Sequence, residues 1–204
     1  MTNSKLIISN LLKPKKLYSR EDILKNTNLI PAQNGIYAWY FKTTPNINLF
    51  KKYYQIESNA KSLFLQDSFK FKNYQLLYIG ISPKDTKSKN NIRNRIKGHM
   101  NGNAYGSTLR LSLGCLLSNE LNITLNKYGS SIHFGEGEEK LSEWINHNAF
   151  VTFQTCEKPW DVEKEAIKTL LLPLNIRDNK NSVFKKPLEE IRKNAKRMAR
   201  LKRS

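Results

Sequence analysis

The chain has 204 residues, which is enough for one well-buried core but short for two full domains. Lys and Arg number 35 against 17 Asp and Glu, so the formal net charge is +18. Self-repulsion of this size indicates a polyanionic partner, which would be nucleic acid, an anionic membrane or an acidic protein. The aromatic content of 10% favours a folded nucleic-acid binder over a disordered basic tail. A general sequence bias toward Lys and Asn explains part of the charge.

The sequence contains no signal for membrane insertion or secretion. No apolar run approaches the roughly 18–20 residues of a membrane span. The start, MTNSKLIISNLLKPKK, lacks the small-residue cleavage site of a secretory signal. Cys115 and Cys156 form no CxxC pair, and no two of the three histidines have ligand spacing. We therefore expect a cytoplasmic protein without a membrane partner, with cysteines acting as small apolar groups and without structural zinc.

The first predicted elements are a short helix and two buried strands. Ser19 offers an N-cap for a helix within LYSREDILKN. An Asn34-Gly35 turn precedes a strand over residues 36–41, which are β-branched or aromatic almost without interruption. Residues 43–73 carry mixed signals and indicate an insertion. The second buried strand is QLLYIGIS, residues 75–82.

Two helices, a hairpin and a further helix are predicted next. Residues 88–100 carry apolar side chains at helical spacing with basic residues between them. A second amphipathic helix begins after Ser107 as its N-cap. The segment NITLNKYGSSIHFG alternates around a Tyr128-Gly129 turn and predicts a hairpin. The segment EEKLSEWINHN predicts another helix.

The last predicted elements are a third strand and two helices. Residues 149–155 alternate as a strand, and a helix capped by Asp161 follows and is halted at Pro173. The tail is a strongly basic helix with one apolar stripe made of Leu188, Ile191, Ala195, Met198 and Leu201. The element order predicts an α+β fold, with a small three-stranded mixed or antiparallel sheet flanked by helices.

Several polar side chains are placed where chemistry could occur. Glu163 shares a line with Ile167 on the packing face of its helix, whereas Glu165 projects about 200° round the axis. A carboxylate in a first turn either stabilises the helix dipole or binds a hard cation, and taken alone the dipole is the commoner reason. Arg95 and His99 share one helix face, where a preorganised arginine can clamp a phosphate. A solvated basic helix and a packing histidine are the ordinary alternatives.

Read together, four segments resemble the GIY-YIG nuclease family. They are Gly35-Ile36-Tyr37, Tyr78-Ile79-Gly80, the helix with Arg95-Ile96-x-x-His99, and the helix from Glu163 to Asn175. This family includes homing endonucleases, the 3′-incision domain of bacterial nucleotide-excision repair and some restriction enzymes. The resemblance implies a three-stranded sheet flanked by helices that hydrolyses nucleic-acid phosphodiesters, with DNA as the first expectation, using one Mg²⁺ or Mn²⁺ ion. The interval from Glu163 to Asn175 is like that of the repair domains and selects Glu163 over Glu165.

Carried over residue by residue, the resemblance assigns a role to each matching position. It implies that Glu163 holds the metal ion and that Arg95 stabilises the charge on the phosphate. Tyr37 or Tyr78 would help to deprotonate water, and the sequence leaves the choice between them open. His99 would assist the tyrosine or contact phosphate. Asn175 would support the site.

The sequence departs from the family pattern in two places. The two tyrosines are 78 − 37 = 41 positions apart, where many members have a short turn, so residues 43–73 would bind DNA or a partner. Some repair members carry a lysine just after the second tripeptide, where this chain has Ile81, and Lys84 is a possible substitute. Gly80 would let the backbone leave the strand without crowding the site.

The resemblance sets the expected domain boundaries and nucleic-acid contacts. We expect one nuclease domain over residues 1–204, with a core at about 34–175 and a basic extension at about 183–204. The family motifs cover about residues 34–101 and 149–175. A nucleic-acid-binding module that has lost catalysis is the alternative function. The side chains expected to contact nucleic acid are Arg93, Lys97, Lys84, Arg110, Lys193, Arg197 and Arg200.

Overall fold

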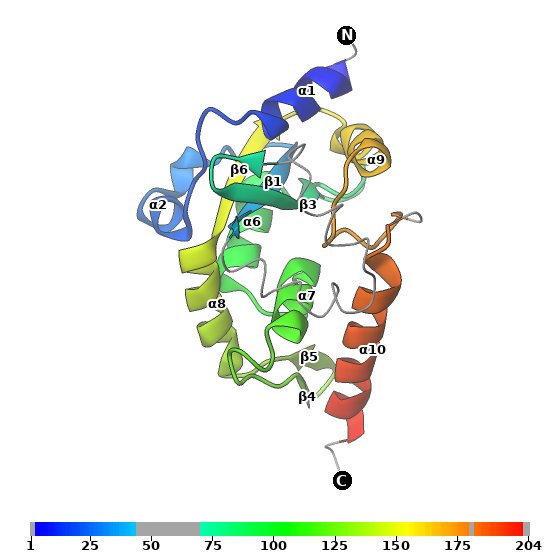
Figure 1. Ribbon diagram of the computed structural model, residues 1–204. Coiled ribbons are helices and arrows are strands. Elements are labelled where there is room, and N and C mark those ends of the chain that lie inside the picture. The colour runs from blue at the N-terminus through cyan, green and yellow to red at the C-terminus, as the bar shows by residue number, and fades with distance from the viewer. Residues whose placement is uncertain (1–2, 44–69, 180–181, 202–204) are drawn as a thin grey trace.

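A computed structural model describes residues 3–43, 70–179 and 182–201 (Figure 1). Its main sheet has the strand order β2-β3-β1-β6 and consists of β1 (Gly35–Lys42), β2 (Lys70–Phe71), β3 (Tyr74–Ser82) and β6 (Ala149–Thr155). A separate hairpin pairs β4 (Asn126–Tyr128) with β5 (Ser131–His133). The α-helices are α1 (Asn3–Leu12), α2 (Arg20–Lys25), α6 (Ile92–Asn101), α7 (Thr108–Leu116), α8 (Gly137–Asn148), α9 (Pro159–Thr169) and α10 (Lys185–Leu201).

Every pairing in the main sheet is antiparallel. β1 lies in the interior, and β3 runs beside it with Tyr37 opposite Gly80 and Trp39 opposite Tyr78. The register shifts after Trp39, so that Leu77 is an extra residue in β3. Because the two family tripeptides lie in directly paired strands, the long connection between them does not separate them in space.

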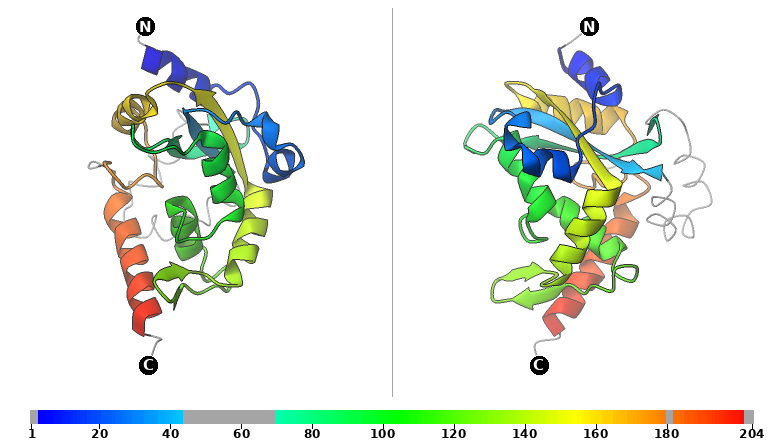
Figure 2. Two further views of the ribbon diagram at one scale, coloured as in Figure 1. Left: turned by 180° about the vertical axis from the view of Figure 1, so that it is seen from behind. Right: turned by 90° about the vertical axis from the view of Figure 1, so that its left-hand side faces the viewer.

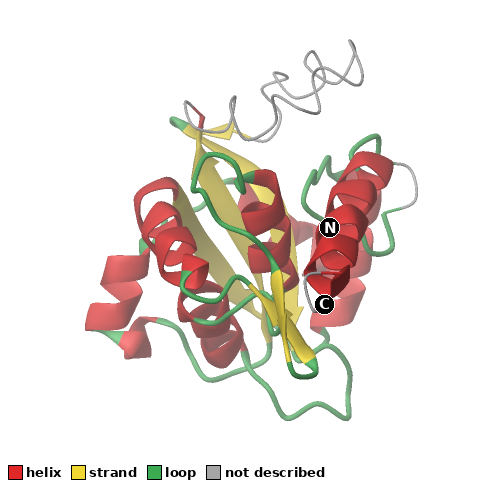
Figure 3. Cartoon of the chain, turned by 90° about the horizontal axis from the view of Figure 1, so that it is seen from below, coloured by secondary structure: helices red, strands yellow, loops and turns green. Residues whose placement is uncertain are grey.

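The sheet is covered by helices on both faces, which is why β1 reads as an uninterrupted apolar run. One face packs against α1 and α9, drawn above the sheet in Figure 1, through Ile36, Ala38 and Tyr40. The other face carries Tyr37, Trp39 and Phe41 and packs toward α6, α7 and α8. The turned views show the same two layers of helices (Figure 2). In Figure 3 the strands are seen between these helices.

Helix α7 is a central helix rather than an amphipathic surface helix. Every residue from Leu109 to Leu116 is buried, and α10 and α8 pack against it. Ser107 caps α7 by accepting a hydrogen bond from the Arg110 backbone N–H at 3.1 Å, as the sequence predicted. The amphipathic interpretation was wrong because it placed Arg110 at the surface.

Other sequence-based boundaries are confirmed or corrected by the structure. Ser19 caps α2 in a capping box with Asp22, as expected. The fold is α+β, with a short fourth strand, β2, beyond the three predicted. Helix α9 begins at Pro159, so Asp161 lies in its first turn and does not cap it. Helix α1 was not predicted, although its buried Ile7, Ile8 and Leu11 have helical spacing.

The apolar stripe of α10 differs at its C-terminal end from the predicted one. Leu188 is fully buried, and Ile191 and Ala195 pack against the same core. Ala199 takes the last buried position, whereas Met198 and Leu201 are 49% and 61% exposed. The buried residues therefore lie 3, 7 and 11 positions after Leu188, and this spacing keeps them on one face of a straight helix.

The two cysteines contribute to the apolar core, as the sequence predicted. Cys115 and Cys156 are free thiols, and burial raises their pKa values to about 12 and about 11. Both thiols are therefore protonated and unreactive near neutral pH. Within the described part of the chain, the helices are too short or too polar to traverse a bilayer.

Candidate active site

Tyr37 and Gly80 form the floor of the candidate site, where β1 pairs with β3. A Cβ atom on Gly80 would collide with the Tyr37 ring, since the ring carbon Cζ would lie only 2.6 Å away and the phenol oxygen closer still. Gly80 thus makes room for the Tyr37 ring. The expectation that Gly80 lets the backbone leave the strand was wrong, because β3 continues through Gly80 to Ser82. Gly35 is required for a similar steric reason, since a side chain there would collide with the Gln154 carbonyl oxygen of β6.

His99 lies buried between Tyr37 and the start of α7. Its Nε2 is 2.7 Å from Tyr37 Oη, and its Nδ1 is 2.7 Å from Ser107 Oγ. The ring also meets Trp39 and Tyr78 edge to face, with centroid distances of 6.1 and 6.0 Å. Burial holds the pKa of His99 well below its usual value, and the Arg95 and Arg110 cations act in the same direction, so the ring is neutral. The ring is 0% exposed, and of the two expected contacts the structure shows the one with the tyrosine.

Arg95 brings a half-buried positive charge to the two tyrosines. Its Nη1 donates to the Gly106 carbonyl oxygen at 2.8 Å, which fixes the guanidinium at the α6 to α7 connection. Burial raises the pKa of Tyr37 well above 10, and Arg95 opposes that rise. The pKa of Tyr78 is also raised by burial, and both Thr108 and Arg95 oppose it. Both phenols are therefore protonated at rest and lie within range of one guanidinium.

Glu163 approaches the same group of side chains from α9. Burial raises the pKa of its carboxyl to about 7, against the opposing effect of Arg177, while Asp178 adds to the rise. Its charge interacts with Arg95 and with both tyrosines. Strands β1 and β3 and helices α6 and α9 thus bring together five of the six expected catalytic side chains, with His99 and Arg95 both coming from α6. Glu165 is also half-buried, so exposure alone does not separate the two glutamates.

Asn175 supports this arrangement from outside the reacting groups. Its Oδ1 accepts from the Ile79 N–H at 2.8 Å, and its Nδ2 donates to the Ile79 carbonyl oxygen at 2.7 Å. The Leu174 N–H donates to the Leu77 carbonyl oxygen at 3.0 Å. The segment after α9 therefore acts as a short substitute strand along the edge of β3. It fixes the backbone on both sides of Tyr78.

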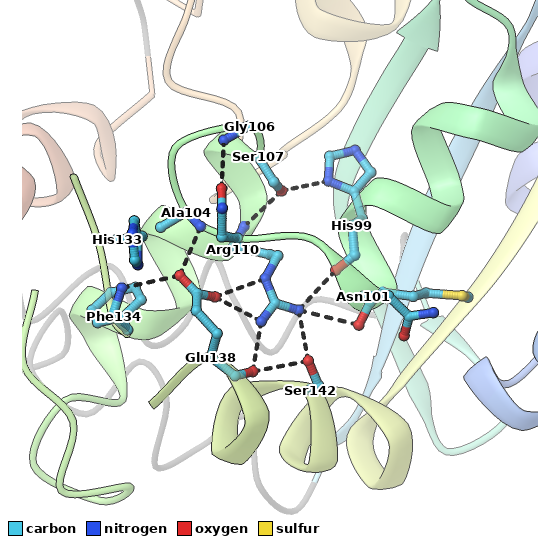
Figure 4. A network of polar contacts seen from close by, with 12 residues as sticks. His99, Asn101, Ala104, Gly106, Ser107, Arg110, His133, Phe134, Glu138 and Ser142 are labelled. Atoms are coloured by element: carbon cyan, nitrogen blue, oxygen red, sulfur yellow. Dashed lines mark hydrogen bonds and ion pairs between the residues drawn. The ribbon is translucent and has the colours of Figure 1, made fainter. Parts of the chain in front are cut away.

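Arg110 is a buried structural residue, contrary to the prediction that it contacts nucleic acid. It is 0% exposed, and its Nε and Nη2 donate to Glu138 Oε2 at 3.0 and 2.7 Å. Its Nη1 donates to the carbonyl oxygens of His99 and Met100 and to Ser142 Oγ (Figure 4). Sequence reasoning missed this network because Arg110 and Glu138 are 28 positions apart.

The other basic candidates lie outside this network. Arg93 ties α6 to the preceding segment, since its Nε donates to the Ile30 carbonyl oxygen at 2.6 Å. Lys97 is half-buried on α6. Lys84 is exposed in the loop after β3, with its Nζ 3.9 Å from the Asp85 carboxylate. Three exposed candidates on α10 line a groove of about 1140 Å³ that also includes Ile176 and Arg177: Lys193, Arg197 and Arg200.

A family model described as the GIY-YIG catalytic domain matches residues 35–197 of this chain. The chain belongs to the GIY-YIG family. Members of this family are generally endonucleases that act on nucleic acids with divalent metals. No curated protein and no solved structure matches the chain significantly.

The GIY-YIG match is wider than the motifs alone indicated. It includes α7, the hairpin, α8 and most of α10, where the motifs ended near residue 175. In this structure α7 is preceded by Ser107, its cap, which contacts the buried histidine of the GIY-YIG site. Of the insertion expected at 43–73, only residues 43 and 70–73 fall within the described ranges. The Thr43 N–H donates to the Asn73 carbonyl oxygen at 3.1 Å, so the two ends of the insertion meet beside β3.

The donor set of this GIY-YIG site fits a hard cation with few protein ligands. Among the described residues, no three His, Cys, Asp or Glu side chains gather into a group that could hold a metal ion. Glu163 offers a single half-buried carboxylate beside protonated phenols. Mg²⁺ is commonly held by one or two carboxylates, with phosphate and water completing its shell.

Proposed function

We propose that this GIY-YIG domain is an endonuclease that hydrolyses phosphodiester bonds, with DNA as its expected substrate, and that it depends on Mg²⁺ or Mn²⁺. The observation that carries the proposal is the electrostatic grouping of Tyr37, Tyr78, Arg95 and Glu163 from four separate elements. A desolvated carboxylate, a guanidinium and two phenols in mutual range are costly to assemble for stability alone. Residues 1–204 are taken as one domain in this proposal.

Glu163 would hold the cation in this proposal. Its raised pKa of about 7 means that Arg177 and Arg95 do not fully offset the loss of solvation of this carboxylate. A bound divalent cation would complete that compensation, polarise the phosphate and favour the phenolate form of a nearby tyrosine. The pH below which the cation is lost should therefore lie near neutrality rather than near pH 4.

Arg95 and a tyrosine would perform the remaining work of hydrolysis. The guanidinium donates hydrogen bonds to the phosphate oxygens and offsets the negative charge that builds on them. The tyrosine would first release its hydroxyl proton to solvent. Its phenolate oxygen then accepts a proton from water, and the resulting hydroxide forms the new bond to phosphorus. The ester bond then breaks, and the leaving oxygen takes up a proton from solvent. Asn175 acts by holding β3, since both its amide bonds go to the Ile79 backbone.

The groove beside α10 is the proposed path of the nucleic acid to this site. Arg177 belongs both to the groove lining and to the surroundings of Glu163. Lys193, Arg197 and Arg200 extend the positive charge along a helix of 17 residues. At about 1.5 Å per residue this helix is roughly 25 Å long, which is about seven base pairs of duplex.

A cleavage assay with matched glutamate variants tests the proposal. Supercoiled plasmid is incubated with the wild type, Glu163→Gln, Arg95→Lys and Glu165→Gln, with Mg²⁺, Mn²⁺ or EDTA. We expect Glu163→Gln and Arg95→Lys to lower the cleavage rate by about a hundredfold or more, and EDTA to abolish cleavage. The Glu165→Gln control should stay within about threefold of the wild type. Equal nicking by all four proteins would overturn the catalytic assignment.

The alternative is a nucleic-acid-binding module that cuts nothing, which the net charge of +18 supports. It is distinguished by measuring binding and cleavage on the same panel of duplex, flap, branched and single-stranded substrates. Binding without metal-dependent cleavage of any substrate would favour the module. Cleavage lost in Glu163→Gln with binding retained would exclude it.

A further inference from the structure

Ser107 joins the capping of α7 to the buried histidine of the site. Its Oγ lies 3.1 Å from the Arg110 backbone nitrogen and 2.7 Å from His99 Nδ1. Ser107 and His99 are 1% and 0% exposed, so bulk water does not compete for these bonds. Figure 4 shows the hydroxyl between the His99 ring and the N-terminus of α7. The Ser107 hydroxyl therefore has two hydrogen-bond partners, and its single proton can be donated to at most one acceptor.

The protons in this chain of hydrogen bonds can be assigned by counting donors and acceptors. The Arg110 N–H can only donate, so it uses one acceptor site of Ser107 Oγ. If His99 Nδ1 carried the ring proton, it would also donate to Oγ, and the Ser107 O–H would need another acceptor. Within the described ranges, Ser107 Oγ has no further hydrogen-bond partner. An unsatisfied buried hydroxyl costs about 1–3 kcal/mol.

The opposite tautomer satisfies Ser107 and both ring nitrogens, and it leaves the Tyr37 hydroxyl proton on the side of the candidate site, where Glu163 interacts with Tyr37. The Ser107 O–H donates to an unprotonated His99 Nδ1, and the ring proton lies on Nε2. The Nε2–H then donates to Tyr37 Oη across 2.7 Å. The neutral state that this requires agrees with the burial of the ring and with Arg95 and Arg110 beside it.

We infer that Ser107 is a positioning residue that holds His99 as its Nε2–H tautomer, so that His99 donates a hydrogen bond to Tyr37 Oη. His99 in this state cannot accept the Tyr37 proton through Nε2. The Tyr37 hydroxyl proton must therefore point away from His99. A donor on its oxygen favours the phenolate form.

This inference deepens the proposed function and rests on it for its catalytic meaning, because it chooses between the two tyrosines. Tyr37 has His99 as a fixed donor and Arg95 as a neighbouring cation. The hydroxyl of Tyr78 interacts with Thr108 and Arg95, and its contact with His99 is through the ring face and edge. Tyr37 is thus the tyrosine whose phenolate, once its proton has left to solvent, is held by a hydrogen bond and can take a proton from water.

The Arg110 network fixes the histidine that Ser107 orients. Arg110 Nη1 donates to the His99 carbonyl oxygen at 3.2 Å, and the Arg110 backbone N–H completes the Ser107 bonds. Glu138 Oε1 accepts from the Ala104 N–H at 2.8 Å and so holds the connection between α6 and α7. Both ring nitrogens of His99 therefore face partners whose own positions are set by buried bonds.

Nitrogen NMR of the full chain tests the tautomer directly and does not depend on nuclease activity. Long-range ¹H–¹⁵N spectra of the ¹⁵N-labelled protein near pH 7.5 report which ring nitrogen of each histidine carries the proton. His147 and His133 are internal references: His147 Nδ1 donates to the Glu143 carbonyl oxygen at 2.9 Å, whereas His133 Nδ1 accepts from the Gly135 N–H at 3.0 Å. We expect His99 to show the His133 pattern. A His99 spectrum with the proton on Nδ1 would overturn the inference.

Ser107 variants test its role in setting that state. Ser107→Ala removes the hydroxyl, and Ser107→Thr keeps it together with the helix cap. We expect Ser107→Ala to broaden the His99 signals or move them toward the Nδ1–H pattern, with the Ser107→Thr spectrum like the wild type. Under the proposed function, Ser107→Ala should also lower kcat by about 10–100-fold with KM nearly unchanged, and Ser107→Thr should restore it.

The two readouts separate the failure of each idea. An inactive wild type with the expected His99 tautomer would reject the nuclease and leave the positioning role of Ser107 standing. A Ser107→Ala protein that keeps the wild-type His99 spectrum would reject the positioning role, whatever its cleavage rate.

Discussion

At the scale of single residues, the site depends on close packing that leaves no room for another atom. The Tyr37 ring lies against Gly80 across the β1 and β3 pair, and its oxygen reaches His99 at 2.7 Å. Moving the ring by a fraction of an ångström would lengthen this bond and shift the phenol relative to Arg95. Gly80 therefore sets the position of Tyr37 as directly as the bond to His99 does.

Alanine substitution at two glycines tests this packing. In Gly80→Ala the new methyl group must displace the Tyr37 ring, so we expect the free energy of unfolding to fall by about 1–3 kcal/mol. Gly98 in α6 is the matched control, because an added Cβ there has no atom within 4 Å. Gly98→Ala should stabilise the helix by about 0.5–1 kcal/mol. Urea denaturation measures both, and equal effects would contradict the packing account.

At the scale of elements, the buried pair of Arg110 and Glu138 joins α6, α7 and α8. The guanidinium reaches the C-terminal carbonyl groups of α6 from its place on α7, and the carboxylate comes from the first turn of α8. Glu138 also accepts from the backbone N–H of Phe134 at 3.1 Å, beyond the end of β5. One ion pair thus sets the relative positions of the helices that hold His99 and Ser107.

Removing one charge of this pair should be more costly than removing both. We expect Arg110→Met to lower the free energy of unfolding by about 3–5 kcal/mol, because Glu138 is left buried and unpaired. The double variant Arg110→Met/Glu138→Gln should recover part of this loss, since the amide oxygen can still accept from Ala104 and Phe134. Denaturant unfolding of the wild type and both variants gives these values. A loss no larger than that of Arg197→Met on exposed α10 would show that the pair is not a structural centre.

At the scale of the whole molecule, the positive charge and the core meet on α10. The helix buries Leu188 and Ala199 against the core that contains α7, and it turns Lys193, Arg197 and Arg200 outward. Deleting residues 185–204 would therefore uncover α7 as well as remove charge, so truncation does not isolate the effect of charge. Substituting only the side chains on the outer face of α10 isolates the effect of charge.

Neutralising the outer face of α10 should weaken binding by a salt-dependent amount. For Lys193→Gln/Arg197→Gln/Arg200→Gln we expect the slope of log K against log salt on duplex DNA to flatten by up to about 2.7, which is about 0.9 for each phosphate that is no longer neutralised. The control removes three lysines beside the edge strand β6, as Lys13→Gln/Lys15→Gln/Lys16→Gln. Fluorescence anisotropy across a salt series measures both. Identical slopes for the two triple variants would show that α10 does not bind phosphate specifically.

The sequence alone determined the features that depend on local patterns. The buried strands, the Ser19 and Ser107 caps and the family motifs each occupy a few neighbouring residues, so composition and spacing reveal them. The helix face that carries Glu163 could also be predicted from the sequence, because 3.6 residues per turn determines which neighbours share a side. The nucleic-acid roles assigned to surface lysines and arginines remain predictions.

Only the tertiary structure decided which polar residues meet. Arg110 looked like a surface cation because its neighbours in the chain do not include Glu138, 28 positions away. Ser107 could be read as a cap, but its bond to His99 depends on how α6 and α7 pack. Local sequence reports backbone preference and the side of an element, whereas the pairing of buried charges and protons depends on how distant segments come together. That pairing is what distinguishes Tyr37 from Tyr78.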